Sequence, residues 1–262
     1  MTENDSQYRQ RATTIAHADH RFLSPLSASK ADWLIDLLDL PAEASVLDVG
    51  CGKAAFLRRV LERYPTASGV GIDINAAFLS IAAAEGVSDG VARRLTLQQR
   101  PAAEYLETCP RFDAVFCFGA SHALGGFDGV AGAARRILNR ASVLLLGEGF
   151  WRQPPSPEYL AVLGATIEEM TDHAGNVARL RHAGFEVLTT AAASADEWDV
   201  YEGLYCRAQI RWADAHPGDP FAPEMLAKAS RWHDAYLRWG RDTLGFGWYL
   251  AVPTARLPAA GI

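Results

Sequence analysis

The chain has 262 residues, of which 49% are hydrophobic, so it is long enough to bury a large core without disulfides or a metal. Its net charge of −6 argues against nucleic acid as a partner, because nucleic-acid-binding surfaces are basic. Four cysteines without a CxxC pair or metal-ligand spacing indicate reduced thiols in a cytoplasmic protein without a metal. We expect no membrane association, because the amino terminus is polar and no apolar run reaches about 18 residues.

Strands and helices are expected to alternate along the chain. Short apolar runs predict strands, and runs with helical spacing predict helices between them. The expected strands are residues 44–50, 68–75, 93–99, 112–121, 141–151, 185–194 and 245–253. The expected helices are residues 27–40, 54–64 (with its arginines facing solvent), 76–87, 130–138, 166–184 and the helical stretch 198–242.

This alternation predicts a Rossmann-like, doubly wound α/β fold with a seven-stranded, mostly parallel sheet. The seventh strand follows a long helical stretch, so we expect it to pair antiparallel with the sixth. We expect one domain over residues 1–262. Within it, residues 1–30 are expected to form an N-terminal lid, and residues 150–175 and 198–242 are expected to form a helical cap.

The stretch VLDVGCGKAAFL, residues 46–57, is the main functional signal. Gly50 and Gly52 let the backbone turn tightly at the end of the first strand and approach a ligand without a Cβ clash. Asp73 ends the second strand, where a carboxylate is able to accept hydrogen bonds from both hydroxyls of a ribose. A plain strand–turn–helix is the alternative. Ala55 at the third position of the pattern leaves a nicotinamide dinucleotide open, but Asp48 favours a charged amine over a pyrophosphate.

The motifs VLDVGCGKAAFL, GVGIDIN and FDAVFCFGASHAL resemble the class I S-adenosylmethionine-dependent methyltransferases over about residues 28–150. Further along, GEGFWRQPPSPEYLAVLG and DEWDVYEGLY resemble a bacterial small-molecule branch. The resemblance implies S-adenosyl-L-methionine as cofactor, with Asp73 on the ribose and Ile74 beside the adenine. It also implies that the methionine and ribose portion faces Asp48, Gly50, Cys51 and Gly52, and we count Phe118 with the cofactor-binding residues.

One position departs from that family. An acidic residue usually follows its third strand and binds the adenine amine, whereas this chain has Gln99 and Arg100 there. Gln99 could accept a hydrogen bond from the amine through its carbonyl, or Arg100 could stack on the ring.

Candidate catalytic residues lie where the fourth and fifth strands end. Ser121 and His122 follow the fourth strand, and His122 is the first candidate for a general base, against a role in capping the next turn. Glu148 ends the fifth strand and faces the expected crevice. Five further side chains are candidate walls or substrate-binding groups: His20, Arg21, Trp151, Trp198 and Tyr201. The helical spacing of Trp198 and Tyr201 is more typical of core packing than of a ligand-binding aromatic box, but both stay candidates because they are expected near the mouth of the sheet.

We therefore expect an enzyme that transfers one-carbon groups, namely a methyltransferase that methylates a nitrogen or oxygen atom of a small molecule. A homodimer is possible. Three alternatives stay open at this point. The first is an enzyme that cyclises the methionine chain and releases methylthioadenosine. The second is a nicotinamide-dependent oxidoreductase, and the third is a non-catalytic nucleoside-binding regulator.

Overall fold

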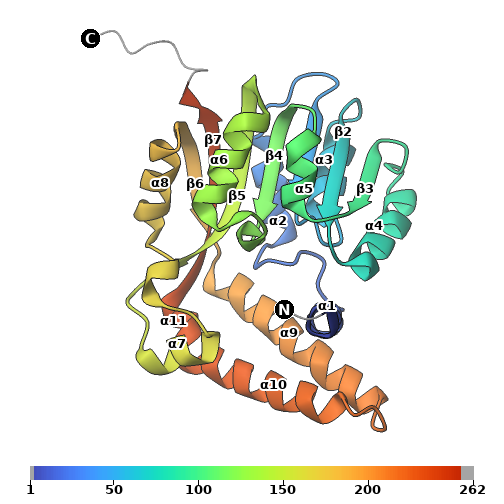
Figure 1. Ribbon diagram of the computed structural model, residues 1–262, viewed down its shortest axis with the longest axis vertical. Coiled ribbons are helices and arrows are strands. Elements are labelled where there is room, and N and C mark those ends of the chain that lie inside the picture. Colours follow the sequence, from blue (N-terminus) through green and yellow to red (C-terminus); the bar gives the residue numbers. More distant parts are fainter. Residues whose placement is uncertain (1–2, 255–262) are drawn as a thin grey trace.

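The structure is a computed structural model that describes residues 3–254. The expected bounds of the domain and lid extend to residues 1–2 and 255–262, which lie outside the described residues. Within residues 3–254 there are seven strands in one sheet, ordered β3-β2-β1-β4-β5-β7-β6 (Figure 1). The strands are β1 (Ser45–Val49), β2 (Ser68–Asp73), β3 (Leu95–Gln99), β4 (Phe112–Phe118), β5 (Leu138–Trp151), β6 (Phe185–Ala192) and β7 (Leu244–Pro253).

The sheet confirms the predicted topology. β1 pairs in parallel with β2 and β4, and β4 pairs in parallel with β5. β7 runs antiparallel to both of its neighbours, β5 and β6. The strand order reverses between β1 and β4, and in open α/β sheets ligands bind at such a point, beyond the carboxyl ends of the strands.

Helices cover both faces of the sheet and its carboxyl end. α2 (Ala28–Asp36), α3 (Ala55–Arg63) and α4 (Ala76–Ser88) pack on one face, and α5 (Ala102–Thr108), α6 (Phe127–Ile137) and α8 (His173–His182) pack on the other. α1 (Glu3–Ala16), α9 (Ala195–Ala215) and α10 (Ala222–Ala235) lie across the carboxyl ends of the parallel strands (Figure 1). Shorter pieces complete the fold: η1 (Ser121–Leu124), α7 (Pro157–Leu163), η2 (Ile167–Glu169), the π-helical η3 (Tyr236–Gly240) and α11 (Arg241–Thr243). No helix in the described part has the length and apolar character needed to cross a bilayer.

Local signals explain where several helices begin. Ser27 accepts a hydrogen bond from the backbone N–H of Lys30 and so caps α2. Asn75 caps α4 in the same way. Ser194 and Glu197 form a reciprocal capping box at the start of α9. Each cap satisfies amide donors that a helix leaves unpaired at its first turn.

Three expectations about the helices need correction. The helix expected over residues 166–184 starts only at His173, because the Asp172 side chain accepts from the N–H of Gly175 and caps a new helix there. α5 was not expected, whereas α7 lies within residues 150–175, which were expected to form part of the helical cap. The arginines of α3 were expected to face solvent, but Arg58 is 3% exposed and forms ion pairs with Glu85 and Asp89 at the end of α4. A buried cation of this kind is tolerated because carboxylates neutralise it.

Candidate functional site

The loop between β1 and α3 has a left-handed backbone at three positions. The φ angles of Gly50, Gly52 and Ala54 are +68°, +53° and +51°. A Cβ on Gly50 would overlap the Cβ of Ala120 in the loop after β4, and a Cβ on Gly52 would overlap the Leu23 side chain. Glycine is therefore favoured at both positions by conformation, and at Gly50 also by space, because the Leu23 methyl group beside Gly52 is the end of a flexible side chain.

Asp73 is held beside this loop at the carboxyl end of β2. One of its carboxylate oxygens, Oδ2, accepts a hydrogen bond of 2.8 Å from the N–H of Gly52. The other, Oδ1, accepts one of 2.8 Å from the N–H of Asn75. Each oxygen keeps a further lone pair, so the carboxylate is oriented and still able to accept from two hydroxyls.

Asp48 lies on β1, just before the glycine loop, and is 4% exposed. Burial, with a smaller contribution from the nearby Asp73 carboxylate, raises the pKa of Asp48 to about 7. Within residues 3–254 we find no hydrogen bond or ion pair to its side chain. Asp48 is therefore a buried acid whose ionised form would be stabilised by an added cation.

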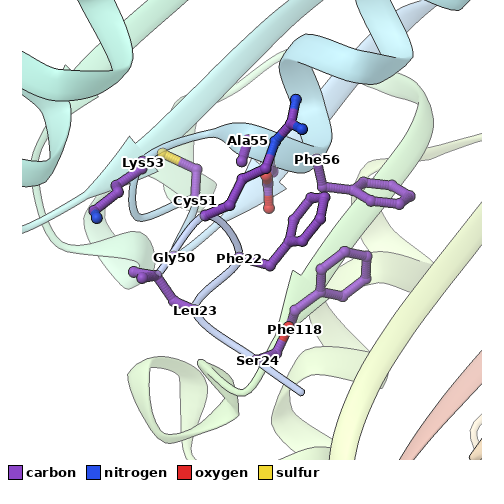
Figure 2. A pocket seen from close by; sticks show the side chains of 11 residues that line it. Phe22, Leu23, Ser24, Gly50, Cys51, Lys53, Ala55, Phe56 and Phe118 are labelled. Atoms are coloured by element: carbon purple, nitrogen blue, oxygen red, sulfur yellow. The ribbon is translucent and has the colours of Figure 1, made fainter. Parts of the chain in front are cut away.

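A small cavity opens over the loop and Asp48 (Figure 2). Its volume is about 30 Å³, roughly the share of one water molecule in the liquid. Eleven residues line it: Arg21, Phe22, Leu23, Ser24, Asp48, Gly50, Cys51, Lys53, Ala55, Phe56 and Phe118. Arg21 and Asp48 thus contribute opposite charges to one cavity, and no carboxylate among the described residues forms an ion pair with Arg21.

The segment that connects α1 to α2, residues 17–26, supplies one wall of this cavity and is called the strap below. Its Phe22, Leu23 and Ser24 lie beside the glycine loop in Figure 2 and line the cavity. The first turn of the strap contacts α9. His17 Nε2 lies 3.0 Å from the Tyr201 hydroxyl, and His20 Nε2 lies 2.9 Å from the Tyr201 carbonyl oxygen. Burial lowers the pKa of His17 to about 4 and also lowers the pKa of His20, so both rings are neutral at pH 7.

The structure brings together Arg21, Asp48, Gly50, Cys51 and Phe118 of the predicted residues. Beside them, Gly52 and Asp73 are joined by the hydrogen bond described above. His20 lies in the strap but does not line the cavity.

The expected adenine-binding residues lie outside the cavity at the open end of β2 and β3. Ile74 is 51% exposed, and the Gln99 Nε2 donates to the Ile74 carbonyl oxygen at 3.4 Å. This leaves the Gln99 carbonyl free to accept. Arg100 lies over the Tyr105 ring, with its guanidinium carbon 5.5 Å from the ring centroid.

The expected catalytic residues are spread around the ends of β4 and β5. His122 is exposed on η1, with Ser121 half-buried beside it. Glu148 Oε1 accepts from the N–H of Gly149 at 3.0 Å, whereas the buried Oε2 has no partner. Side chains alternate along a strand, so Glu148 shares a face with Leu146, on the side of the sheet opposite to Asp48. None of the three lines the cavity in this structure.

The three aromatic candidates pack mainly within the cap. The Trp151 side chain contacts Tyr159 and its Nε1 donates to the Ile167 carbonyl oxygen at 3.0 Å. Trp198 is 6% exposed and its ring lies 6.5 Å from that of Phe246. The burial of Trp198 matches the core packing that its helical spacing favoured.

Lys53 and the apolar strap residues were not predicted as site residues. The stretch RFLSPL, residues 21–26, is unusually apolar for a chain terminus and was the only signal for the contact of the strap with the loop. Lysine is normally solvated, so nothing in the sequence pointed to the burial of Lys53.

Comparison with known proteins gives the methyltransferase assignment that the sequence motifs indicated. A model of a methyltransferase domain matches residues 47–144. The crystal structure of an S-adenosylmethionine-dependent methyltransferase from Thiobacillus denitrificans, in complex with S-adenosyl-L-homocysteine, is 30% identical, with a TM-score of 0.86 over 93% of this chain and 98% of that one. A methyltransferase from Geobacter sulfurreducens, in complex with the same molecule, is 28% identical, with a TM-score of 0.87 and the same coverage. The methyltransferase ungE' of Aspergillus campestris is 33% identical over 220 residues, 80% of this chain and 60% of that protein.

The chain therefore belongs to the S-adenosylmethionine-dependent methyltransferases of the Rossmann-like type, and its cofactor is S-adenosyl-L-methionine. The residues present fit this molecule. Gly50 and Gly52 carry no side chain, so a ligand is able to approach the backbone of the loop once Leu23 moves aside, and the oriented Asp73 carboxylate has free lone pairs for a ribose. Asp48 and Arg21 together suit the ammonium and carboxylate of an amino acid. Family membership favours this cofactor over the nicotinamide dinucleotide that the glycine spacing left open.

Proposed function

We propose that the protein transfers the methyl group of S-adenosyl-L-methionine to a nitrogen or oxygen atom of a small-molecule acceptor. The observation that carries this proposal is the cover over the carboxyl end of the sheet. The strap and α9 enclose the region beside the glycine loop, and the cavity left there is about 30 Å³. A compact acceptor is able to enter such a site after a modest opening, whereas a folded macromolecule would need an open groove.

Each residue at the loop binds a different part of the cofactor. Asp48 pairs with the ammonium of the methionine arm and Arg21 with its carboxylate, because charge-assisted hydrogen bonds are the strong ones in a buried site. Asp73 accepts from the ribose hydroxyls. Gln99 accepts from the adenine amine through its free carbonyl oxygen.

The bound cofactor supplies an electrophilic methyl group on a sulfonium, and transfer is a displacement by the acceptor atom. The chain contributes alignment and the exclusion of water. The Phe118 ring lines the cavity and offers a π face to positive charge. His122, with Ser121 beside it, remains the candidate base for an acceptor that must lose a proton, whereas Glu148 lies on the opposite side of the sheet from Asp48.

Cyclisation of the methionine chain is the second candidate function, because a site without room for an acceptor would favour it. The 30 Å³ cavity does not distinguish the two reactions, since it is too small for the cofactor as well as for an acceptor. The wider family relationship favours methyl transfer.

The test is to incubate the protein with S-adenosyl-L-methionine, alone and with a panel of amines, phenols and carboxylic acids, and to identify products by mass spectrometry. S-adenosylhomocysteine with a methylated acceptor is expected only in the presence of the right panel member. Methylthioadenosine formed without any acceptor would establish the cyclisation instead. Asp48→Asn should abolish most product, and Asp113→Asn, which changes an aspartate far from the loop, serves as the matched control.

A further inference from the structure

Lys53 lies in the glycine loop, between Gly52 and Ala54, and is buried to an unusual degree. The residue is 5% exposed, although lysine ammonium groups normally remain in water. Its Nζ donates to the carbonyl oxygens of His17, Ala18 and His20 at 2.8, 3.0 and 2.8 Å. No carboxylate in the described part of the chain forms an ion pair with it. An ammonium has three donors, so these three carbonyls satisfy it completely.

The three carbonyl groups all belong to the first turn of the strap, immediately after α1 ends at Ala16. They lie just beyond the carboxyl end of the helix, where the negative end of the helix dipole adds to their attraction for a cation. Lys53 therefore ties the start of the strap to the glycine loop. The other end of the strap is fixed at Ser27, whose N–H donates to Glu197 Oε1 at 3.1 Å and whose hydroxyl caps α2.

Between these two fixed points the strap closes on the cofactor site. The Leu23 side chain occupies the position that a Cβ on Gly52 would take, and Phe22 and Ser24 line the remaining cavity (Figure 2). Pockets for ligands of cofactor size have volumes of roughly 300–1,000 Å³, against about 30 Å³ here. The middle of the strap must therefore move aside when the cofactor enters and again when its product leaves.

We propose that Lys53 is a positioning residue that holds the strap against the glycine loop and so sets the rates at which the cofactor enters and S-adenosylhomocysteine leaves. The proposal rests on the cofactor site of the proposed function and not on the identity of the acceptor. Lys53 acts through the strap residues that contact the cofactor, and it needs no contact with the cofactor itself.

The experiment compares full-length wild-type protein with Lys53→Met, which keeps the aliphatic stem and removes the donors. Association and dissociation of S-adenosylhomocysteine are followed by surface plasmon resonance or stopped-flow fluorescence. Both rates are expected to rise about tenfold. The variant loses the hydrogen bonds from Lys53 to the strap, and their net energy shifts the equilibrium between closed and open strap by about that factor. The equilibrium affinity is expected to change less than either rate.

Arg94→Met is the matched control. Arg94 donates to the carbonyls of Leu61, Tyr64 and Ala67 at 2.8, 3.2 and 2.8 Å, at the end of α3 and away from the strap. This variant also loses side-chain bonds to three carbonyls, so it should lose stability but keep wild-type rates for S-adenosylhomocysteine. Equal acceleration in both variants would mean that general destabilisation, and not the strap, controls the rates, and would overturn the proposal.

Trypsin cleavage after the exposed Arg21 gives a second readout that needs no ligand. Cleavage should be faster in Lys53→Met than in wild type. Unchanged ligand rates together with unchanged cleavage would refute the role of Lys53. If Lys53→Met does not fold, Leu23→Ala loosens the same strap without touching a charge and should accelerate both rates; unchanged rates there refute the proposal. If wild type binds no S-adenosylhomocysteine, the cofactor site fails, while the cleavage comparison still tests the strap.

Discussion

Replacing Asp48 by asparagine should stabilise the free protein and weaken cofactor binding. Asp48 is 4% exposed, and its pKa is raised from 3.8 to about 7 by burial and then by Asp73. The folded protein thus holds a proton that the unfolded chain has lost between about pH 4 and 7. Each pKa unit corresponds to about 1.36 kcal/mol, so ionising Asp48 in the fold costs about 4 kcal/mol.

The sign follows from the raised pKa. As the pH rises from 4 to 7, the unfolded chain binds fewer protons than the folded one, and the free energy of unfolding of the wild type falls. Asp48→Asn has no such titration. Its stability relative to wild type should therefore grow by up to about 4 kcal/mol between pH 4 and pH 8, whatever the fixed cost of burying the amide.

The cofactor affinity of the wild type should rise with pH, whereas its free energy of unfolding falls. A bound ammonium favours the Asp48 carboxylate, so the affinity of wild type for S-adenosylhomocysteine should rise as the pH passes through about 7. At pH 8 the affinity of Asp48→Asn should be about 10- to 100-fold lower than that of the wild type, which is the contribution of a charge-assisted hydrogen bond. The affinity of this variant should hardly change with pH.

Urea denaturation and titration calorimetry over pH 5–8 measure both effects. Asp113→Asn is the control, because burial raises the Asp113 pKa but hydrogen bonds from Ser45 and Asn139 outweigh it and lower the pKa overall. That variant should lose stability at pH 8 and bind S-adenosylhomocysteine normally. An Asp48→Asn protein with wild-type affinity, and with no gain in stability toward pH 8, would refute the reasoning.

Three further substitutions test other parts of the site and fold. Gly50→Ala should lower the melting temperature and abolish calorimetric binding of S-adenosylhomocysteine, because its φ of +68° costs about 1–3 kcal/mol and its Cβ meets Ala120; normal binding would contradict this account of the loop. Asp73→Asn should weaken that binding by about 1–3 kcal/mol, since an amide cannot accept from Gly52 and two ribose hydroxyls at once; unchanged calorimetric affinity would remove the ribose assignment. Arg58→Met should lower the free energy of unfolding in urea by about 1–3 kcal/mol, because its carboxylate partners are left unpaired but partly solvated; a change in ligand affinity is not expected.

The fold was largely predictable because its signals are local. Apolar runs marked all of the strands, Gly50 and Gly52 marked the turn after β1, and the long helical stretch before β7 indicated its antiparallel pairing. The burial of Arg58 was not predictable, because its carboxylate partners lie 27 and 31 residues further along the chain. The sequence of α3 shows only an amphipathic pattern, and such a pattern predicts that every arginine side chain is exposed to solvent.

The site was predictable only on its cofactor side. Gly50, Gly52 and Asp73 belong to one strand–turn–helix–strand unit, so their spacing carries the geometry. The roles of Lys53 and of Leu23 depend on a segment about 30 residues away folding back onto the loop. The candidate acceptor-side residues were chosen from loops and cap helices with no shared register, so the order of the sequence says little about which of them meet.

The contact of the strap with α9 also affects the order in which the protein matures. His17 and Tyr201 are 184 residues apart in the chain, so on the ribosome the strap is made early but its docking surface emerges late. The strap and the glycine loop are therefore both made well before the α9 surface on which the strap docks. A newly made chain should therefore hold the strap by Lys53 alone until α9 has left the exit tunnel, and only then gain the contacts of His17 and His20 with Tyr201.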